Sequence, residues 1–346
     1  MDLDHTPALP PPLNVEPNFA QLSGILPLRY AVSAVSLFLC SVFVAIRMYV
    51  RVRIQRIFNL DDCAVLLSAA GFIAFTVIII LAGLEGDGKH QWNVSVSHFR
   101  AILLYLNIVE ILYGPTIFGA KYAILRQIET IFFSHRRESR TYKAIRALIW
   151  ANLAYYLATT FVYLLACIPR EKIWNPTVDG HCINQQDVIV LTPALNVISD
   201  VTILVVPVAE VFKLQMPLKT KLSVAAIFAV GLLSLVAGIV RLYYSVLLKQ
   251  SEDLTWHIAP VGHWAIGEFV TVILIACFPY VPPLVRFHKR STHTSSYQLP
   301  SLGESVGSKQ RTAQCGDSAL DDNSSVKALH SQGRRACVDV ETASFT

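Results

Sequence analysis

Residues 63–84 read CAVLLSAAGFIAFTVIIILAGL, a run of 22 residues without a charged side chain. An α-helix of about 20 apolar residues is long enough to cross the ~30 Å hydrocarbon core of a bilayer. A second uncharged run of 22 residues covers 147–168. Runs of this length are better explained by lipid than by the interior of a soluble protein, so both predict membrane-spanning helices.

Similar apolar blocks recur along the whole chain. They lie at about residues 25–46, 61–84, 99–125, 145–168, 187–212, 221–247 and 258–281. The composition is 53% hydrophobic and 15% charged, and the mean hydropathy is +0.48, which is far from the average of soluble domains. The sequence therefore predicts an all-α membrane protein built as a seven-transmembrane-helix bundle, and it excludes an ordinary soluble fold.

Lys and Arg are distributed unevenly between the two sides of these blocks. Sixteen lie in the connections on one side, including Arg47, Arg51 and Arg126, and six lie on the other side, including Arg29 and Lys89. Because cytosolic connections are enriched in Lys and Arg, we predict an outside N-terminus and a cytosolic C-terminus. The net charge of +5 is divided into short clusters that act as topology signals, so we expect no nucleic-acid partner.

The two ends of the chain differ in composition from the apolar region. Residues 1–24 are acidic and proline-rich, and residues 286–346 are rich in Ser, Thr and charge. Such segments bury too little apolar surface to offset the entropy of ordering. We predict a disordered extracellular N-terminus over 1–24, a seven-helix domain over 25–285 and a disordered cytosolic tail over 286–346.

The predicted outer face contains two candidate modification sites. Cys167 and Cys182 bracket an outer connection, where the oxidising secretory route permits a disulfide. Asn93 opens the sequon Asn93-Val94-Ser95 in the first outer connection and is a candidate glycosylation site. The histidines show neither a helical ligand pair nor a Cys/His zinc spacing, so we expect no metal site.

Polar side chains inside the apolar blocks are the best candidates for a functional interior, because a charge at membrane depth is costly unless it is paired. They are Glu110, Lys121, Asn196, Asp200, Arg241 and Glu268. At ~1.5 Å of rise per residue, Arg241 and Glu268 both lie roughly 10–14 Å below the outer surface, so an ion pair between them is predicted.

The other interior residues allow further predictions. Asn196 and Asp200 share one face of their helix at i, i+4 spacing. Lys121 lies near the inner end of its helix, where we expect it to extend to the cytosolic interface or to meet Asp61 and Asp62. Two interpretations remain open for the whole set: a hydrogen-bond network that locks the bundle, and direct contact with a ligand or a proton.

The order of short motifs over residues 47–284 resembles that of the fungal rhodopsin-domain family. The matching motifs are Arg47-x-Tyr49-x-Arg51 before Asp61-Asp62, Gly88-Lys89-His90-x-Trp92, Lys121, Cys167-x-Pro169 through Trp174 to Cys182, Asn196-x-x-x-Asp200, Pro207, Lys221, Gly231, Arg241-Leu242, Asp253-x-Thr255-Trp256, Trp264-x-x-x-Glu268 and Cys277-x-Pro279. One departure is Lys121-Tyr122-Ala123, where the family has Lys-Leu-Ser. The resemblance implies seven-helix membrane proteins, some receptor-like and some in secondary-metabolite clusters.

Two functions follow from these patterns. The leading hypothesis is a receptor-like sensor, not an enzyme, in the plasma membrane or another secretory-pathway membrane, with an unknown small-molecule ligand and a cytosolic signalling partner. The alternative is a membrane-embedded enzyme or accessory protein of a secondary-metabolite pathway, in which a buried carboxylate acts on an apolar substrate. We expect no retinal, because residues 258–285 contain no lysine to form a Schiff base. We also expect no other cofactor.

Overall fold

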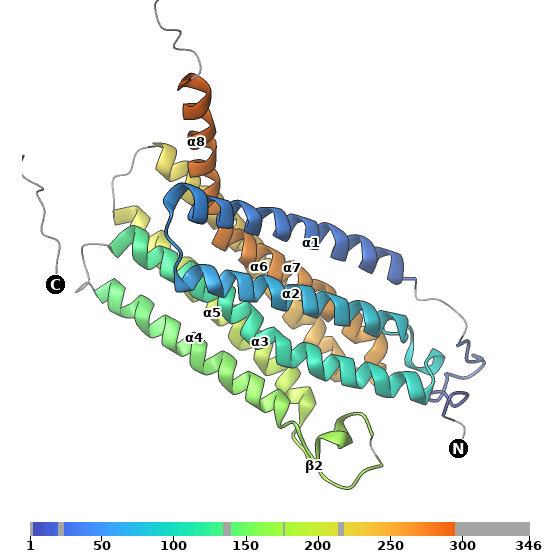
Figure 1. Ribbon diagram of the computed structural model, residues 1–346. Helices are drawn as coiled ribbons and strands as arrows, with labels where there is room; N and C mark the ends of the chain where they lie inside the picture. Colours follow the sequence, from blue (N-terminus) through green and yellow to red (C-terminus); the bar gives the residue numbers. More distant parts are fainter. Residues whose placement is uncertain (1–2, 20–23, 134–139, 176, 214–217, 295–346) are drawn as a thin grey trace, which may run out of the picture. The chain divides into compact units, whose positions relative to one another are not determined.

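The computed structural model describes residues 3–19, 24–133, 140–175, 177–213 and 218–294. Within these ranges seven helices are long and apolar enough to cross a bilayer, which confirms the predicted seven-helix membrane fold. They are α1 (Leu26–Tyr49), α2 (Leu60–Leu84), α3 (Val96–Phe133), α4 (Arg140–Leu164), α5 (Gln185–Lys213), α6 (Leu218–Gln250) and α7 (Leu254–Cys277). In Figure 1 these helices lie side by side as one bundle.

Short elements connect the helices at the two ends of the bundle. A π-helical turn, η1 (Val50–Gln55), continues α1, and a 3₁₀ turn, η4 (Phe278–Tyr280), leads from α7 into α8 (Val281–Thr294). The opposite end carries η2 (Gln91–Asn93), β1 (Cys167–Ile168), η3 (Arg170–Ile173) and β2 (His181–Cys182). We call the end that holds β1 and β2 the disulfide end and the other the α8 end (Figure 1).

Side-chain hydrogen bonds explain where two of the helices begin. At the start of α2 the Asn59 backbone N–H donates to Asp62 Oδ2 at 3.1 Å, which is half of a capping box. At the start of α7 the Asp253 carboxylate accepts from the backbone N–H groups of Trp256 at 3.4 Å and Gln91 at 2.9 Å. Asp253 therefore caps α7 and ties it to η2.

Helix α3 lies at the centre of the bundle and contacts α2, α4, α5 and α7. Small residues allow its closest approach to α2. A Cβ atom added to Gly119 would stand 2.8 Å from the backbone oxygen of Ala64, so α2 and α3 could not pack as they do with a larger residue there. Close packing through small residues is a common means of joining helices in a membrane, where lipid removes the hydrophobic drive between them.

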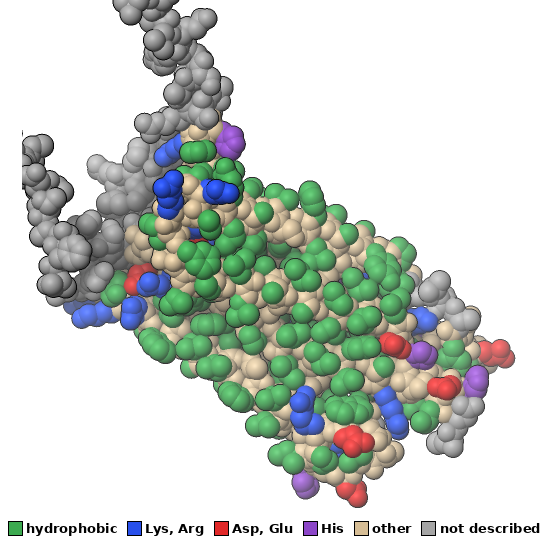
Figure 2. Space-filling view, viewed as in Figure 1, with side chains coloured by type: hydrophobic (Ala, Val, Ile, Leu, Met, Phe, Trp, Pro, Cys, Tyr) green, Lys and Arg blue, Asp and Glu red, His purple; other side chains and the backbone are tan. Residues whose placement is uncertain are grey.

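The flank of the bundle is apolar. Figure 2 shows hydrophobic side chains covering the face between the two ends, and large ones such as Phe38, Trp150 and Leu233 are more than half exposed. An exposed apolar surface of this extent in a soluble monomer would drive association. It fits hydrocarbon as the surrounding solvent, and we conclude that the protein is an integral, multi-pass membrane protein.

The N-terminal segment is hydrogen-bonded to the disulfide end. The Ala8 backbone N–H donates to Val94 O at 2.9 Å, and the Val96 N–H donates to Thr6 O at 3.0 Å. The Asn18 N–H donates to Oδ1 of Asn93, the candidate glycosylation site, at 3.0 Å. Glycosylation of this half-buried side chain stays a prediction, as does the predicted disorder of residues 1–24.

The predictions about the domain boundary, the tail and the orientation in the membrane stay predictions. Helix α8 extends to Thr294, past the predicted domain boundary at residue 285. Residues 295–346, most of the predicted tail, lie outside the described residues, as do Arg136 and Arg137. Which end of the bundle faces the cytosol stays a prediction from the count of Lys and Arg.

Candidate functional site

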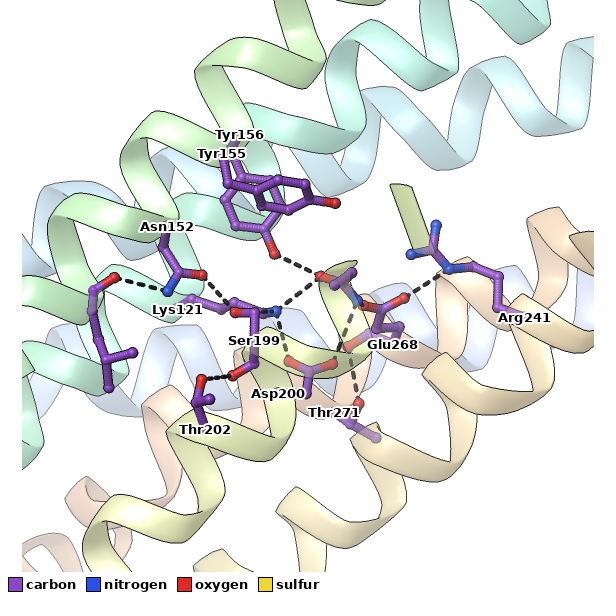
Figure 3. A network of polar contacts seen from close by, with 12 residues as sticks. Lys121, Asn152, Tyr155, Tyr156, Ser199, Asp200, Thr202, Arg241, Glu268 and Thr271 are labelled. Carbon is purple, nitrogen blue, oxygen red and sulfur yellow. Dashed lines mark hydrogen bonds and ion pairs between the residues drawn. The ribbon is translucent and has the colours of Figure 1, made fainter. Parts of the chain in front are cut away.

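Five of the six predicted interior residues meet in one polar network in the middle of the bundle. Figure 3 labels four of them, Lys121, Asp200, Arg241 and Glu268. Two tyrosines complete the network. The members of this central network are Tyr113 and Lys121 from α3, Tyr156 from α4, Asn196 and Asp200 from α5, Arg241 from α6 and Glu268 from α7. The network therefore links five of the seven membrane helices.

The first ion pair of the network joins α3 to α5. Lys121 Nζ lies 2.6 Å from Asp200 Oδ1 and donates to Ser199 Oγ at 3.3 Å. The prediction that Lys121 reaches the cytosolic interface or meets Asp61 and Asp62 is wrong. Those two carboxylates are bound by arginines of α1 and η1, whereas Lys121 pairs with Asp200 of α5.

The second ion pair joins α6 to α7 and confirms a prediction. Arg241 Nε lies 3.1 Å from Glu268 Oε2. The Tyr113 hydroxyl stands between the two side chains, where it accepts from Arg241 Nη2 at 2.8 Å and donates to Glu268 Oε1 at 2.8 Å. The guanidinium carbon of Arg241 also lies 4.4 Å from the centre of the Tyr113 ring, a favourable cation–π distance.

Asn196 connects the two ion pairs. Its Oδ1 accepts from Lys121 Nζ at 2.9 Å and from the Tyr156 hydroxyl at 2.6 Å. Its Nδ2 donates to Asp200 Oδ2 at 3.4 Å, which confirms that the two residues share a face of α5, and also to Glu268 Oε1. A movement of either ion pair must therefore change the hydrogen bonds of this one amide.

Glu110 lies beside the network at a small cavity. The cavity has a volume of about 20 Å³, and its lining includes Glu110, Tyr113 and Arg241. Roughly 10–15 Å³ of such space is the minimum for one water molecule. The cavity thus has room for a water molecule and not for a ligand.

The charges of the site do not balance as simple pairs. Three carboxylates, Glu110, Asp200 and Glu268, accompany two cations, Lys121 and Arg241. Lys121 is 1% exposed and Glu268 is fully buried. Removing one partner from a pair at such depth leaves an uncompensated charge, which is strongly destabilising. Chemically, the arrangement can hold helices together, and it can also exchange ionic partners around Arg241.

A second charged cluster, at the α8 end, was missed by the sequence analysis. This Arg47 cluster consists of Arg47, Arg51, Asp61 and Asp62. Arg47 Nη2 lies 2.8 Å from Asp61 Oδ2 and 2.9 Å from Asp62 Oδ1, and Arg51 Nη2 lies 2.6 Å from Asp61 Oδ2. The sequence marks Arg47 and Arg51 as topology signals and as part of a family motif, but it predicts no ion pair for them. The signal that could have found them is the pair of adjacent aspartates in an apolar block.

Arg29, which the sequence places with the outer Lys and Arg, has a buried partner at the disulfide end. It lies in α1, is 1% exposed, and its Nη1 lies 2.8 Å from Asp87 Oδ2. Burial raises the pKa of the Asp87 carboxyl above its usual value, and the positive charge of Arg29 offsets this only in part. This pair closes the disulfide end between α1 and the connection that follows α2.

The predicted disulfide between Cys167 and Cys182 is present. The two residues are directly opposite each other in the antiparallel pairing of β1 and β2. The bridge fixes the connection between α4 and α5 as a closed loop. Within the described residues, no group of three His, Cys, Asp or Glu side chains is placed to hold a metal ion.

Comparison with known proteins identifies the family of this fold. The model of the fungal rhodopsin domain matches residues 46–287. A SAT4 family membrane protein of Emericella nidulans is 38% identical over 239 residues, which cover 69% of this chain and 60% of that protein. The chain thus spans under two thirds of the length of that relative.

Two further relatives carry names from biosynthesis clusters. Fugralins biosynthesis cluster protein 2 of Gibberella zeae is 24% identical over 83% of this chain and 72% of its own length. Polyenoic acids biosynthesis gene cluster protein Ba17b of Metarhizium anisopliae is 25% identical over 70% of this chain and 69% of its own length. Since the family model matches the bundle from the end of α1 into α8, the chain belongs to the fungal rhodopsin domain family.

Proposed function

We propose that this protein is a receptor-like membrane sensor without a retinal chromophore. The observation that carries the proposal is the central network, in which Asn196 joins the Lys121–Asp200 pair to the Arg241–Glu268 pair. A ligand shifts a bundle only by binding its two conformations with different affinity. A network that crosses five helices gives such a shift a defined set of bonds to break and remake.

Arg241 is the element of the network that changes partners. Its Nε atom and Glu268 Oε2 are 3.1 Å apart, yet both are buried without a well-aligned hydrogen bond. Glu110 lines the same cavity as Arg241 and supplies a second carboxylate. A small displacement of α6 relative to α7 would transfer the guanidinium from one carboxylate toward the other. Two packed arrangements of this kind are typical of switching bundles.

The direction of signalling follows from the predicted orientation. The disulfide end faces the outside, where a thiol pair is oxidised, and the α8 end with its basic connections faces the cytosol. A ligand then arrives at the disulfide end, and a cytosolic partner reads the α8 end. Helix α7, over Leu254–Cys277, contains no lysine, so a retinal Schiff base in this helix is not part of the mechanism.

The names of two relatives support a second candidate function, that of a pathway protein. Two of them are named as biosynthesis cluster proteins, and the interior holds the carboxylates Glu110, Asp200 and Glu268. In this alternative one of these acids acts on an apolar pathway intermediate, or the protein assists an enzyme that does. The water-sized cavity beside Arg241 favours the sensor, because an enzyme needs room for its substrate at the acid.

The test uses a deletion strain complemented with Glu268→Gln or Arg241→Ala. For a sensor, we expect both variants to abolish the response that the wild-type gene restores, when the variants are compared with the wild type at equal amounts of protein in the membrane. Glu85→Gln is the matched control, because Glu85 pairs with His98 at the surface of the disulfide end, away from the network. It should restore the response fully.

Metabolite profiles of the same strains separate the two functions. Accumulation of one pathway intermediate in the deletion strain, together with an unchanged morphogenetic or host response, would contradict the sensor and support the function in a biosynthetic pathway. Full responses from Glu268→Gln and Arg241→Ala would remove the central network from the mechanism.

A further inference from the structure

A second and much larger cavity opens at the disulfide end. Its volume is about 510 Å³, which is within the range of roughly 300–1,000 Å³ that is typical of small-molecule sites. Phe99 of α3, Ile189 of α5, Leu248 of α6 and Leu254 of α7 line it. Those are the four helices that carry the two ion pairs of the central network.

One layer of apolar side chains separates this outer pocket from the cavity beside Arg241. The layer is a hydrophobic cluster built from Leu248, Ile258 and Val261, with Leu106, Ile189, Tyr244 and Leu254 packed against it. Ile189, Leu248 and Leu254 also line the outer pocket. Leu106, Ile258 and Val261 also line the cavity of Glu110 and Arg241. Whatever displaces the floor of the outer pocket therefore displaces the wall of the Arg241 cavity.

The polar part of the lining is rich in amides and poor in free charge. Gln91, Gln186 and Gln250 contribute carboxamide groups, each of which can both donate and accept. The Lys249 ammonium, also in the lining, is neutralised by Asp187 at 2.5 Å. The remaining charge at the rim is the exposed carboxylate of Glu252, which disfavours an anion.

We propose that this outer pocket binds a neutral, amphipathic small molecule, with its apolar body on Phe99, Ile189 and Leu248 and its hydroxyl or carbonyl groups on the amides. The inference rests on the proposed sensor and names the class of its ligand. The N-terminal segment forms part of the site, because Leu9 lines the pocket and its neighbour Ala8 is held by Val94.

The first test compares two probes that share one apolar body. N-phenyl-1-naphthylamine is neutral, and 8-anilino-1-naphthalenesulfonate adds a negative charge. With the full-length protein in nanodiscs and empty nanodiscs as the blank, we expect saturable binding of the neutral probe at one site, at least about tenfold tighter than that of the sulfonate. Equal or tighter binding of the sulfonate would overturn the ligand class.

A filled variant locates the binding. Gln186→Trp/Ile189→Trp places two indoles into the pocket from adjacent turns of α5, and we expect it to weaken the neutral probe by about tenfold or more. Leu195→Trp/Ile198→Trp is the matched control, since it has the same spacing on α5 but lies at lipid-exposed positions. Equal binding by both variants would place the probe outside the pocket and refute the site.

A labelling measurement covers the case in which the filled variant does not fold. Ile189→Cys should react with a water-soluble methanethiosulfonate, and the neutral probe should slow that reaction. The background carries alanine at Cys63, the exposed free cysteine of the described residues, and at Cys315 and Cys337, which lie outside the described residues. Asp179→Cys, in the exposed outer loop, should react at the same rate with and without the probe. No protection at residue 189 would refute the site.

The outcomes separate this site from the proposed function. If the neutral probe binds and Glu268→Gln leaves the response unchanged, the pocket is a binding site but the central network does not transmit its signal. If Glu268→Gln abolishes the response and the neutral probe does not bind, the proposed sensor is supported and the proposed ligand site is refuted.

Discussion

The Arg47 cluster and the central network are both built from buried ion pairs, but they differ in how completely their atoms are bonded. In the Arg47 cluster, Arg47 donates to both aspartates and to Ala276 O at 2.6 Å, and Asp62 also accepts from Arg51 at 3.1 Å. In the central network, Arg241 Nε and Glu268 Oε2 lack a well-aligned hydrogen bond, and a cavity lies beside them.

From this difference we infer that the Arg47 cluster holds its helices in one arrangement, whereas the central network is a candidate switch. A fully satisfied charged cluster has no lower-energy arrangement nearby, so it fixes α1, α2 and α7 relative to one another at the α8 end. A partly satisfied network beside a water-sized space and a second carboxylate, Glu110, has another arrangement within reach. The following measurements test that contrast.

The largest effect is expected from Arg47→Met. The substitution leaves Asp61 and Asp62 buried with Arg51 as their remaining cation, so the free energy of unfolding should fall by about 5 kcal/mol, the upper end of values for broken buried pairs. Thermal unfolding of the purified protein in detergent measures it. Arg53→Met, at an exposed position of η1, is the control. Equal stability of the two variants would show that the Arg47 cluster does not stabilise the bundle.

Lys121→Met should have a smaller effect. It removes the partner of one carboxylate, Asp200, and we expect a loss of about 3 kcal/mol, the lower end of the same range. The double variant Lys121→Met/Asp200→Asn should recover most of that loss, because no uncompensated charge remains. Stability of all three proteins is compared by the same unfolding measurement, and a double variant no more stable than the single one would contradict the pair.

Tyr113→Phe should change function more than stability. It removes the hydroxyl shared by Arg241 and Glu268, at a cost of about 1.5–3 kcal/mol for hydrogen bonds to charged groups. If Arg241 is the switching element, the dose–response curve of the complemented strain should shift, whereas Tyr243→Phe, at an exposed position of α6, should leave it in place. A loss of stability without a shift of the dose–response curve would show that the network only stabilises the bundle.

The smallest effect concerns pH. The pKa of Asp87 is raised by burial from its usual 3.8, so the folded protein retains this proton more readily than the unfolded chain. The stability that the protonated form contributes is present below the ordinary carboxyl value and is lost as the pH rises through the raised pKa. Asp87→Asn should flatten the dependence of unfolding temperature on pH in that window, and Asp179→Asn should not.

The sequence located some parts of the site and not others, for identifiable reasons. The pairing of Arg241 with Glu268 followed from equal depth in two neighbouring helices, which counting residues provides. The partner of Lys121 did not follow, because depth alone cannot decide between Asp61, Asp62 and Asp200 on different helices. Tyr113 and Tyr156 were not found, since a tyrosine in an apolar block gives no sign of where its hydroxyl points.

By itself the sequence determined the seven membrane helices, because each rests on a local property, about 20 successive residues that are more stable in hydrocarbon than in water. It also indicated which polar side chains lie inside. Only the tertiary structure decided which charges pair, which cluster is fully bonded and where a ligand-sized space opens. Those depend on distances between helices far apart in the chain, which are set by side-chain packing and not by hydropathy.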